Sequence, residues 1–67
     1  MKLSDKASTT LAAAQRRADA AGAFTSYPLG DEDGLDHVYL NVLMRKGLVE
    51  ATGGLGMWRL TDAGRAA

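Results

Sequence analysis

Apolar residues recur every three or four positions over residues 3–21, which predicts an amphipathic helix that begins after Ser4 and ends before Gly22. The stripe consists of Leu3, Ala7, Leu11, Ala14, Ala18 and Ala21. Ser4 stands where an N-cap is needed, Asp5 follows it in the first turn, and Gly22 supplies a C-cap. Because most of the stripe is alanine, we expect Leu3 and Leu11 to anchor this helix.

A second helix is predicted over residues 37–46. Asp36 precedes it as an N-cap, Arg45 and Lys46 lie at its negative end, and Gly47 stops it. One side, which we expect to face the core, carries Tyr39, Leu40 and Leu43. The opposite side carries Val38, Asn41, Val42 and Arg45. The helix thus presents one core face and one face open to a partner.

Between these helices the helical periodicity stops. Pro28 excludes a continuous helix, and residues 30–34, Gly-Asp-Glu-Asp-Gly, are turn formers. A short strand over residues 23–25 and a single helical turn over residues 27–30 are the elements that this length allows. We expect no full helix here.

Strand-like spacing appears near the end of the chain, over residues 48–51 and 57–60. The glycine-rich connection Thr52-Gly53-Gly54-Leu55-Gly56 predicts a β-hairpin. We expect Trp58 to be part of the core, and alternation turns Arg59 toward solvent. Thr61, followed by Asp62, is typical of the N-cap of a last helix.

Composition limits the class of protein. The chain of 67 residues has room for one domain, residues 1–67, and its 46% hydrophobic and 24% charged residues are typical of a folded globular protein. A core this small is often supported by disulfides, a metal or a partner subunit. With no cysteine and one histidine, disulfide and metal support have no obvious ligands, so we expect no cofactor. A partner subunit, as in a homodimer, or an unusually well-packed fold is left.

Other functional classes lack their signatures. No apolar run reaches the roughly 20 residues of a membrane span, and no signal-type segment follows Met1, so the expected location is the cytoplasm. A nucleophile and base pair is missing as well, because the single histidine has no cysteine and the acids cluster in a loop. We therefore do not expect an enzyme.

Three motifs follow one another after residue 39: Leu40-x-x-Leu43-x-x-x-Gly47-Leu48-Val49-Glu50, the glycine-tipped hairpin, and Trp58-Arg59-Leu60-Thr61-Asp62-Ala63-Gly64-Arg65. Their order and spacing together resemble winged-helix regulators of the MarR and PadR kind. The resemblance implies an α+β, mainly α, winged helix-turn-helix in which helix 37–46 enters the major groove and the two-stranded hairpin, residues 49–60, is the wing. The family's supporting helix is unmatched over residues 26–35, so we expect it to be shortened or remodelled.

Double-stranded DNA is accordingly the first expected partner of a small transcriptional regulator. His37, Asn41, Arg45 and Lys46 extend from the second helix, where they are able to reach base edges or phosphates. Arg16 and Arg17 on the first helix and Arg59 in the hairpin complete the predicted DNA-binding set. Ordinary solvation of a polar helix face is the alternative for the helix residues, and for Arg59 the alternative is a surface arginine that keeps an edge strand soluble.

A protein partner is the second expectation, because eight basic and eight acidic residues cancel to a net charge of zero. Val38 and Val42 are apolar on the outer side of the helix, although either one packs in the core if the helix is rotated slightly. Asp31, Glu32, Asp33 and Asp36 crowd the helix entrance as a solvated loop with a cap, a divalent-cation loop, or a surface that imitates nucleic acid. These features are typical of a phage-type interaction module or inhibitor.

Overall fold

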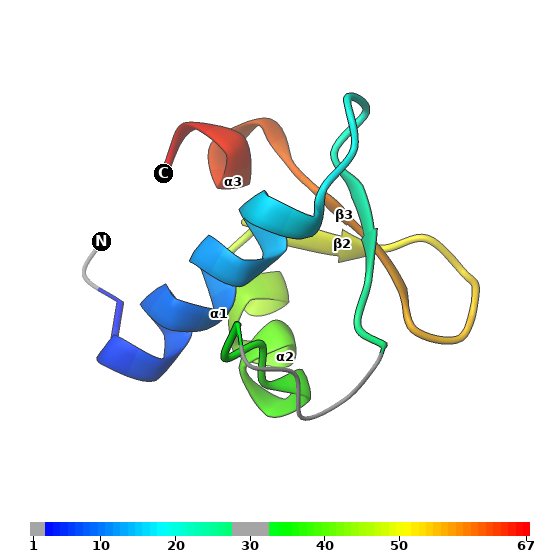
Figure 1. The fold of residues 1–67 in the computed structure, drawn as a ribbon. Coiled ribbons are helices and arrows are strands. Elements are labelled where there is room, and N and C mark those ends of the chain that lie inside the picture. Colours follow the sequence, from blue (N-terminus) through cyan, green and yellow to red (C-terminus); the bar gives the residue numbers. More distant parts are fainter. Residues whose placement is uncertain (1–2, 28–32) are drawn as a thin grey trace.

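Residues 3–27 and 33–67, which the computed structural model describes, form three helices and one three-stranded antiparallel sheet (Figure 1). The elements follow the order α1 (Asp5–Arg17), β1 (Ala23–Thr25), α2 (His37–Arg45), β2 (Val49–Ala51), β3 (Met57–Leu60) and α3 (Asp62–Ala66). The predicted α+β class is confirmed. Lys46, predicted as the last helical residue of α2, is its C-cap instead.

All three predicted N-caps are present. The Ser4 hydroxyl accepts a hydrogen bond from the Ala7 amide at 3.2 Å, and the Asp36 carboxylate accepts one from the Val38 amide at 2.9 Å. Thr61 caps α3 by accepting from a main-chain amide at 3.1 Å. Each cap satisfies a donor that the first helical turn leaves without a partner.

The first helix ends earlier than predicted, at Arg17 with Ala18 as its C-cap, and not at Ala21 with Gly22 as the cap. The Asp19 carboxylate accepts hydrogen bonds from the amides of Ala21 (2.8 Å) and Ala23 (3.0 Å) and so closes a tight turn. Gly22 belongs to this turn, with φ of 85°. The predicted apolar stripe is therefore wrong at its end, because Ala21 lies exposed in the turn.

The sheet has the strand order β1-β3-β2, so it is larger than the predicted two-stranded hairpin. The predicted strand over residues 23–25 is confirmed, and Phe24 lies opposite Trp58 on β3. The hairpin of β2 and β3 is confirmed as well, with Glu50 opposite Arg59. Gly56, at φ of 71°, takes the left-handed conformation that this turn requires.

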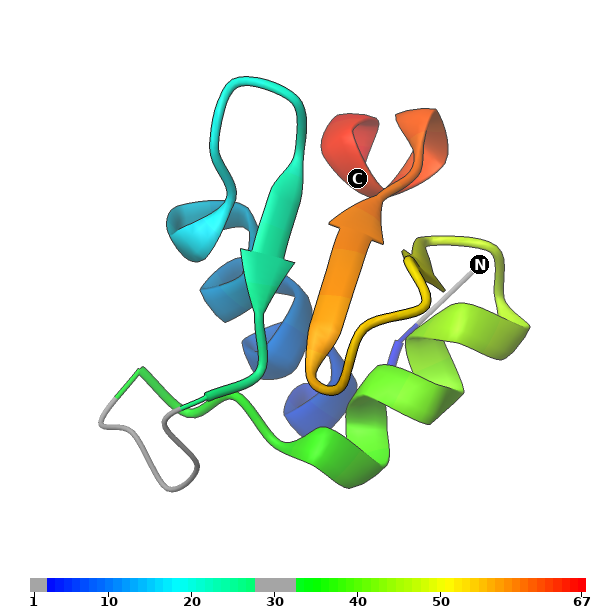
Figure 2. The same ribbon diagram turned by 90° about the vertical axis from the view of Figure 1, so that its right-hand side faces the viewer.

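The helices cover one face of the sheet, and Figure 2 shows α1 behind β1 and β3. Trp58 is 7% exposed and belongs to the core, as predicted, whereas its neighbours Met57 and Arg59 face solvent. The buried apolar residues are Ala7, Leu11, Ala13, Ala14, Phe24, Leu35, Leu40, Leu43, Leu48, Val49, Trp58 and Leu60. Strand alternation therefore separates a core face from an open face of the sheet.

The contact between α1 and α2 fixes the second helix. Thr10 is fully buried, and its hydroxyl accepts a hydrogen bond from the Asp36 amide at 3.2 Å. Thr10 and Ala13 lie outside the predicted stripe, because α1 packs against both α2 and β1 and buries a wider face. The start of α2 is thereby joined to the middle of α1.

The helical turn predicted over residues 27–30 falls largely outside the described residues, as do Asp31 and Glu32. Among the residues described between β1 and α2, none is helical.

Candidate nucleic-acid interface

The outer side of α2 is a surface of mixed chemistry. Leu40 and Leu43 are fully buried, so the residues on the opposite side project away from the protein. Val38 is 67% exposed, Asn41 and Arg45 are also exposed, and Val42 is half-buried. The predicted division of α2 into two faces is confirmed for Leu40 and Leu43 on the core side and for Val38, Asn41 and Arg45 on the outer side, whereas Val42 is partly buried.

Two cations at the end of α2 are available for an external partner. Arg45 and Lys46 are exposed, and within the described part of the chain neither forms an ion pair or a side-chain hydrogen bond. The Asn41 amide likewise has no hydrogen-bonding partner among residues 3–27 and 33–67. These three polar groups keep their full capacity to bind.

His37, another residue predicted to contact DNA, has an intramolecular contact. Its ring meets the Trp58 ring edge to face, with centroids 5.9 Å apart and an interplanar angle of 83°. Such a contact contributes packing energy and orients the imidazole. His37 is still exposed, but the contact with β3 restricts its reach.

Arg59 of the hairpin is paired across the sheet. Its Nε donates to Glu50 Oε1 at 2.8 Å, and Nη2 bonds to the same oxygen. The two side chains are 53% and 44% exposed, so water screens their attraction. The hairpin therefore offers an acid and a base that neutralise each other, which the sequence prediction for Arg59 did not include.

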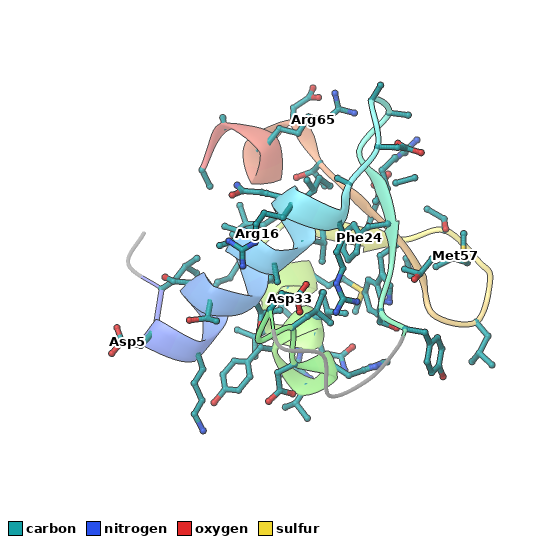
Figure 3. All side chains as sticks on the ribbon, in the orientation of Figure 1. Asp5, Arg16, Phe24, Asp33, Met57 and Arg65 are labelled. Atoms are coloured by element: carbon teal, nitrogen blue, oxygen red, sulfur yellow. The ribbon has the colours of Figure 1, made fainter. Side chains whose placement is uncertain are left out.

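Arg17 is directed inward toward the loop before α2. Its Nε and Nη2 donate to the two carboxylate oxygens of Asp33 at 2.7 and 2.9 Å, and Nη1 donates to the Thr25 carbonyl at 3.1 Å. Figure 3 shows Asp33 between α1 and α2. The Arg17 guanidinium lowers the pKa of the Asp33 carboxyl below its ordinary value, against the opposing effect of burial. Through these contacts Arg17 joins α1, β1 and the loop before α2.

Arg16 lies beside this ion pair on the exposed side of α1, where Nη2 is 3.4 Å from the Asp33 carbonyl oxygen (Figure 3). That long hydrogen bond leaves most of its guanidinium open to solvent. Of the two predicted arginines on α1, Arg16 is thus the more accessible.

The acidic segment has two described roles. Asp36 caps α2, as predicted, while Asp33 accepts from Arg17 and from the Leu35 amide at 3.2 Å. Within residues 3–27 and 33–67, no three His, Asp or Glu side chains gather as ligands for a metal ion. The structure therefore gives the described acids of this segment structural contacts.

An apolar patch around the hairpin turn was not predicted. Leu55 is 90% exposed, and Tyr27 and Met57 are exposed to 48% and 41%. The Tyr27 ring packs over Gly56 so closely that a Cβ added there would overlap the ring carbons. In the sequence, the feature that could have indicated this patch was Leu55, which stands among the glycines of the turn.

A hollow of about 370 Å³ lies between the end of α1 and α3. Two of its polar side chains are already engaged: Gln15 donates to the carbonyls of Gly64 (2.9 Å) and Ala67 (3.0 Å), and Arg65 donates to that of Ala21 (2.5 Å). These bonds hold α3 against α1 and the turn that follows it.

Comparisons with known proteins give no relative: no family model, no curated protein and no solved structure matches this chain. In the described part of the chain, no helix has both the length and the apolar character needed to cross a membrane.

Proposed function

We propose that this chain is a winged-helix DNA-binding domain, in which α2 enters the major groove and the β2–β3 hairpin is the wing. The order of elements supports the assignment, because a helix, a strand, the α2 helix, a hairpin and a threonine-capped helix follow one another as in the resembling family. The family's supporting helix has no counterpart among the described residues between β1 and α2. The Thr10–Asp36 hydrogen bond and the Arg17–Asp33 ion pair brace α2 in its place.

The outer side of α2 carries the proposal. Asn41, Arg45 and Lys46 are exposed there, and none of them has a polar side-chain partner among the described residues. Arg45 and Lys46 supply the positive charge that attracts phosphate, and the Asn41 amide is suited to a base edge. A transcriptional regulator that binds DNA as a homodimer is the function that this surface supports best.

The predicted basic residues do not contribute equally. Arg17 and Arg59 are held by Asp33 and Glu50, so the attraction to phosphate depends mainly on Arg45 and Lys46. Because so few phosphates are neutralised, we expect weak binding that salt easily disrupts.

A salt titration with random-sequence duplex DNA tests the proposal. The chain should bind at low ionic strength, and the double variant Arg45→Ala/Lys46→Ala should reduce the slope of log affinity against log salt by about 0.9 for each phosphate that is no longer neutralised. Arg65→Gln removes one positive charge, half the change of the double variant, at the opposite end of the molecule from α2 (Figure 3) and is the control for charge outside the site. Because Arg65 also donates to the Ala21 carbonyl, circular dichroism should check that this variant is folded. Absence of binding at low salt overturns the proposal, since electrostatic attraction is then strongest.

A protein-interaction module, such as a phage-type inhibitor, is the second candidate. The specific observation in its favour is the apolar exposure of Val38, and of Leu55 and Met57 in the hairpin. Exposed apolar patches mark protein contacts more often than phosphate contacts. This candidate would be favoured if the chain fails to bind DNA and if a protein that it captures is no longer bound by Val38→Asp or Leu55→Asp.

The mass of the protein in solution, measured by light scattering, tests the proposed homodimer.

A further inference from the structure

We infer that α2 recognises A·T base pairs in the major groove through a ridge formed by Val38, Asn41 and Arg45. The inference rests on the proposed function and specifies which DNA the same site prefers. It starts from the spacing of these residues at i, i+3 and i+7, which places them on one line along the helix. All three are exposed, and the line lies opposite the buried Leu43.

The chemistry of the ridge matches an adenine and a thymine. The Asn41 amide nitrogen is able to donate to adenine N7 while its oxygen accepts from the adenine N6 amino group, which is the bidentate contact that amides make. Val38 is 67% exposed and offers methyl groups for contact with the C5 methyl of thymine. A G·C pair offers neither the adjacent acceptor and donor of adenine N7 and N6, which an amide contacts with both of its polar atoms, nor a methyl group.

The exposure of Val38 also favours thymine as the base that this ridge contacts. An apolar side chain gains nothing from phosphate, but it gains from the only apolar group in the major groove, the thymine methyl. Arg45, one helical turn beyond Asn41, then reaches the backbone at the end of the site. From Val38 to Arg45 the helix rises about 10 Å, the length of roughly three base pairs.

Four alternating duplexes test this inference: A·T, G·C, A·U and I·C. The A·U duplex lacks only the thymine methyl, and the I·C duplex presents the major-groove groups of G·C with a minor groove that lacks the guanine amino group. We expect affinity for A·T to exceed that for G·C at least about fivefold, and I·C to behave as G·C does. Replacing thymine by uracil should reduce affinity about threefold.

Single substitutions of Asn41 and Val38 test which residue is responsible for each part of the base preference. Asn41→Ala should remove most of the difference between A·T and G·C, and Val38→Ala should bind A·T and A·U with nearly equal affinity. Both positions are exposed and alanine favours a helix, so folding should be preserved. Lys46→Ala is the control, because removing a group that binds phosphate should weaken binding to every duplex equally.

The outcomes separate this inference from the proposed function. Equal binding to all four duplexes overturns the inference and leaves a DNA-binding domain without base preference. Binding of I·C as tight as that of A·T also overturns it, because the minor groove or duplex shape is then being read. Failure to bind any duplex overturns the proposed function together with the inference.

Discussion

Removing the carboxylate of Glu50 should strengthen DNA binding, because it releases Arg59. In the structure Glu50 Oε1 accepts from two nitrogens of the Arg59 guanidinium, one of them at 2.8 Å. Glu50→Gln keeps the size of the side chain and removes its charge. Since both side chains are about half exposed, the variant should lose only ~0.2–1 kcal/mol of folding free energy.

The gain in binding follows from one additional phosphate contact. Each such interaction adds about 0.9 to the slope of log affinity against log salt, which is roughly a 3.5-fold change in affinity between about 50 and 200 mM salt. Fluorescence anisotropy with a labelled random duplex across this range measures both affinity and slope. We expect the slope of Glu50→Gln to be steeper than that of the unaltered chain by close to the value for one phosphate.

Two further variants distinguish Arg59 from a general effect of charge. Asp5→Asn changes the net charge by the same amount on the side of the molecule away from the hairpin (Figure 3). The double variant Glu50→Gln/Arg59→Ala removes the released guanidinium as well. If Asp5→Asn raises affinity as much, or if the double variant keeps the gain, the reasoning about the Glu50–Arg59 pair is refuted.

Two predictions concern stability. Gly64→Ala should destabilise the fold by ~2–3 kcal/mol in urea unfolding, although alanine suits a helix better, because the added Cβ would overlap the Leu48 carbonyl oxygen. The control Ala63→Gly, at an exposed neighbouring position, should lose only ~1 kcal/mol of stability. A Gly64→Ala variant as stable as the unaltered chain would contradict this packing. Asp33→Asn should cost ~1 kcal/mol at pH 7 by removing the ion pair with Arg17. Folding lowers the pKa of Asp33 from its ordinary value of 3.8, so the ion pair's contribution to stability is present above that pH and is lost as pH falls through the lower, folded value. The two proteins should therefore become equally stable in acid, and a difference in stability that is independent of pH would argue against the ion pair.

Local sequence signals predicted the elements of this fold well. Ser4, Asp36 and Thr61 begin helices because a cap depends only on residues within one turn of it. The hairpin was predictable for a similar reason, since glycines at its turn take conformations that other residues rarely adopt. The end of α1 at Arg17 was not, because the carboxylate of Asp19 closes a turn that competes with a continued helix.

Predicting the state of the site residues required tertiary structure. Arg17 and Asp33 are 16 positions apart, and only the packing of the loop against α1 brings them into contact. The pairing of Glu50 with Arg59 was accessible in principle, because opposite charges on facing strands attract once the hairpin register is known. The outer face of α2 was predicted correctly because helical spacing alone separates Asn41 from the buried side.

The central claim, that α2 is a DNA-binding helix, is tested most directly by mixing the chain with random-sequence duplex DNA at low ionic strength and raising the salt. We predict a complex that forms at low salt, dissociates as salt increases, and weakens when Arg45 and Lys46 are replaced by alanine. A chain that forms no complex at the lowest salt, or whose complex is unaffected by the double variant, would contradict the account.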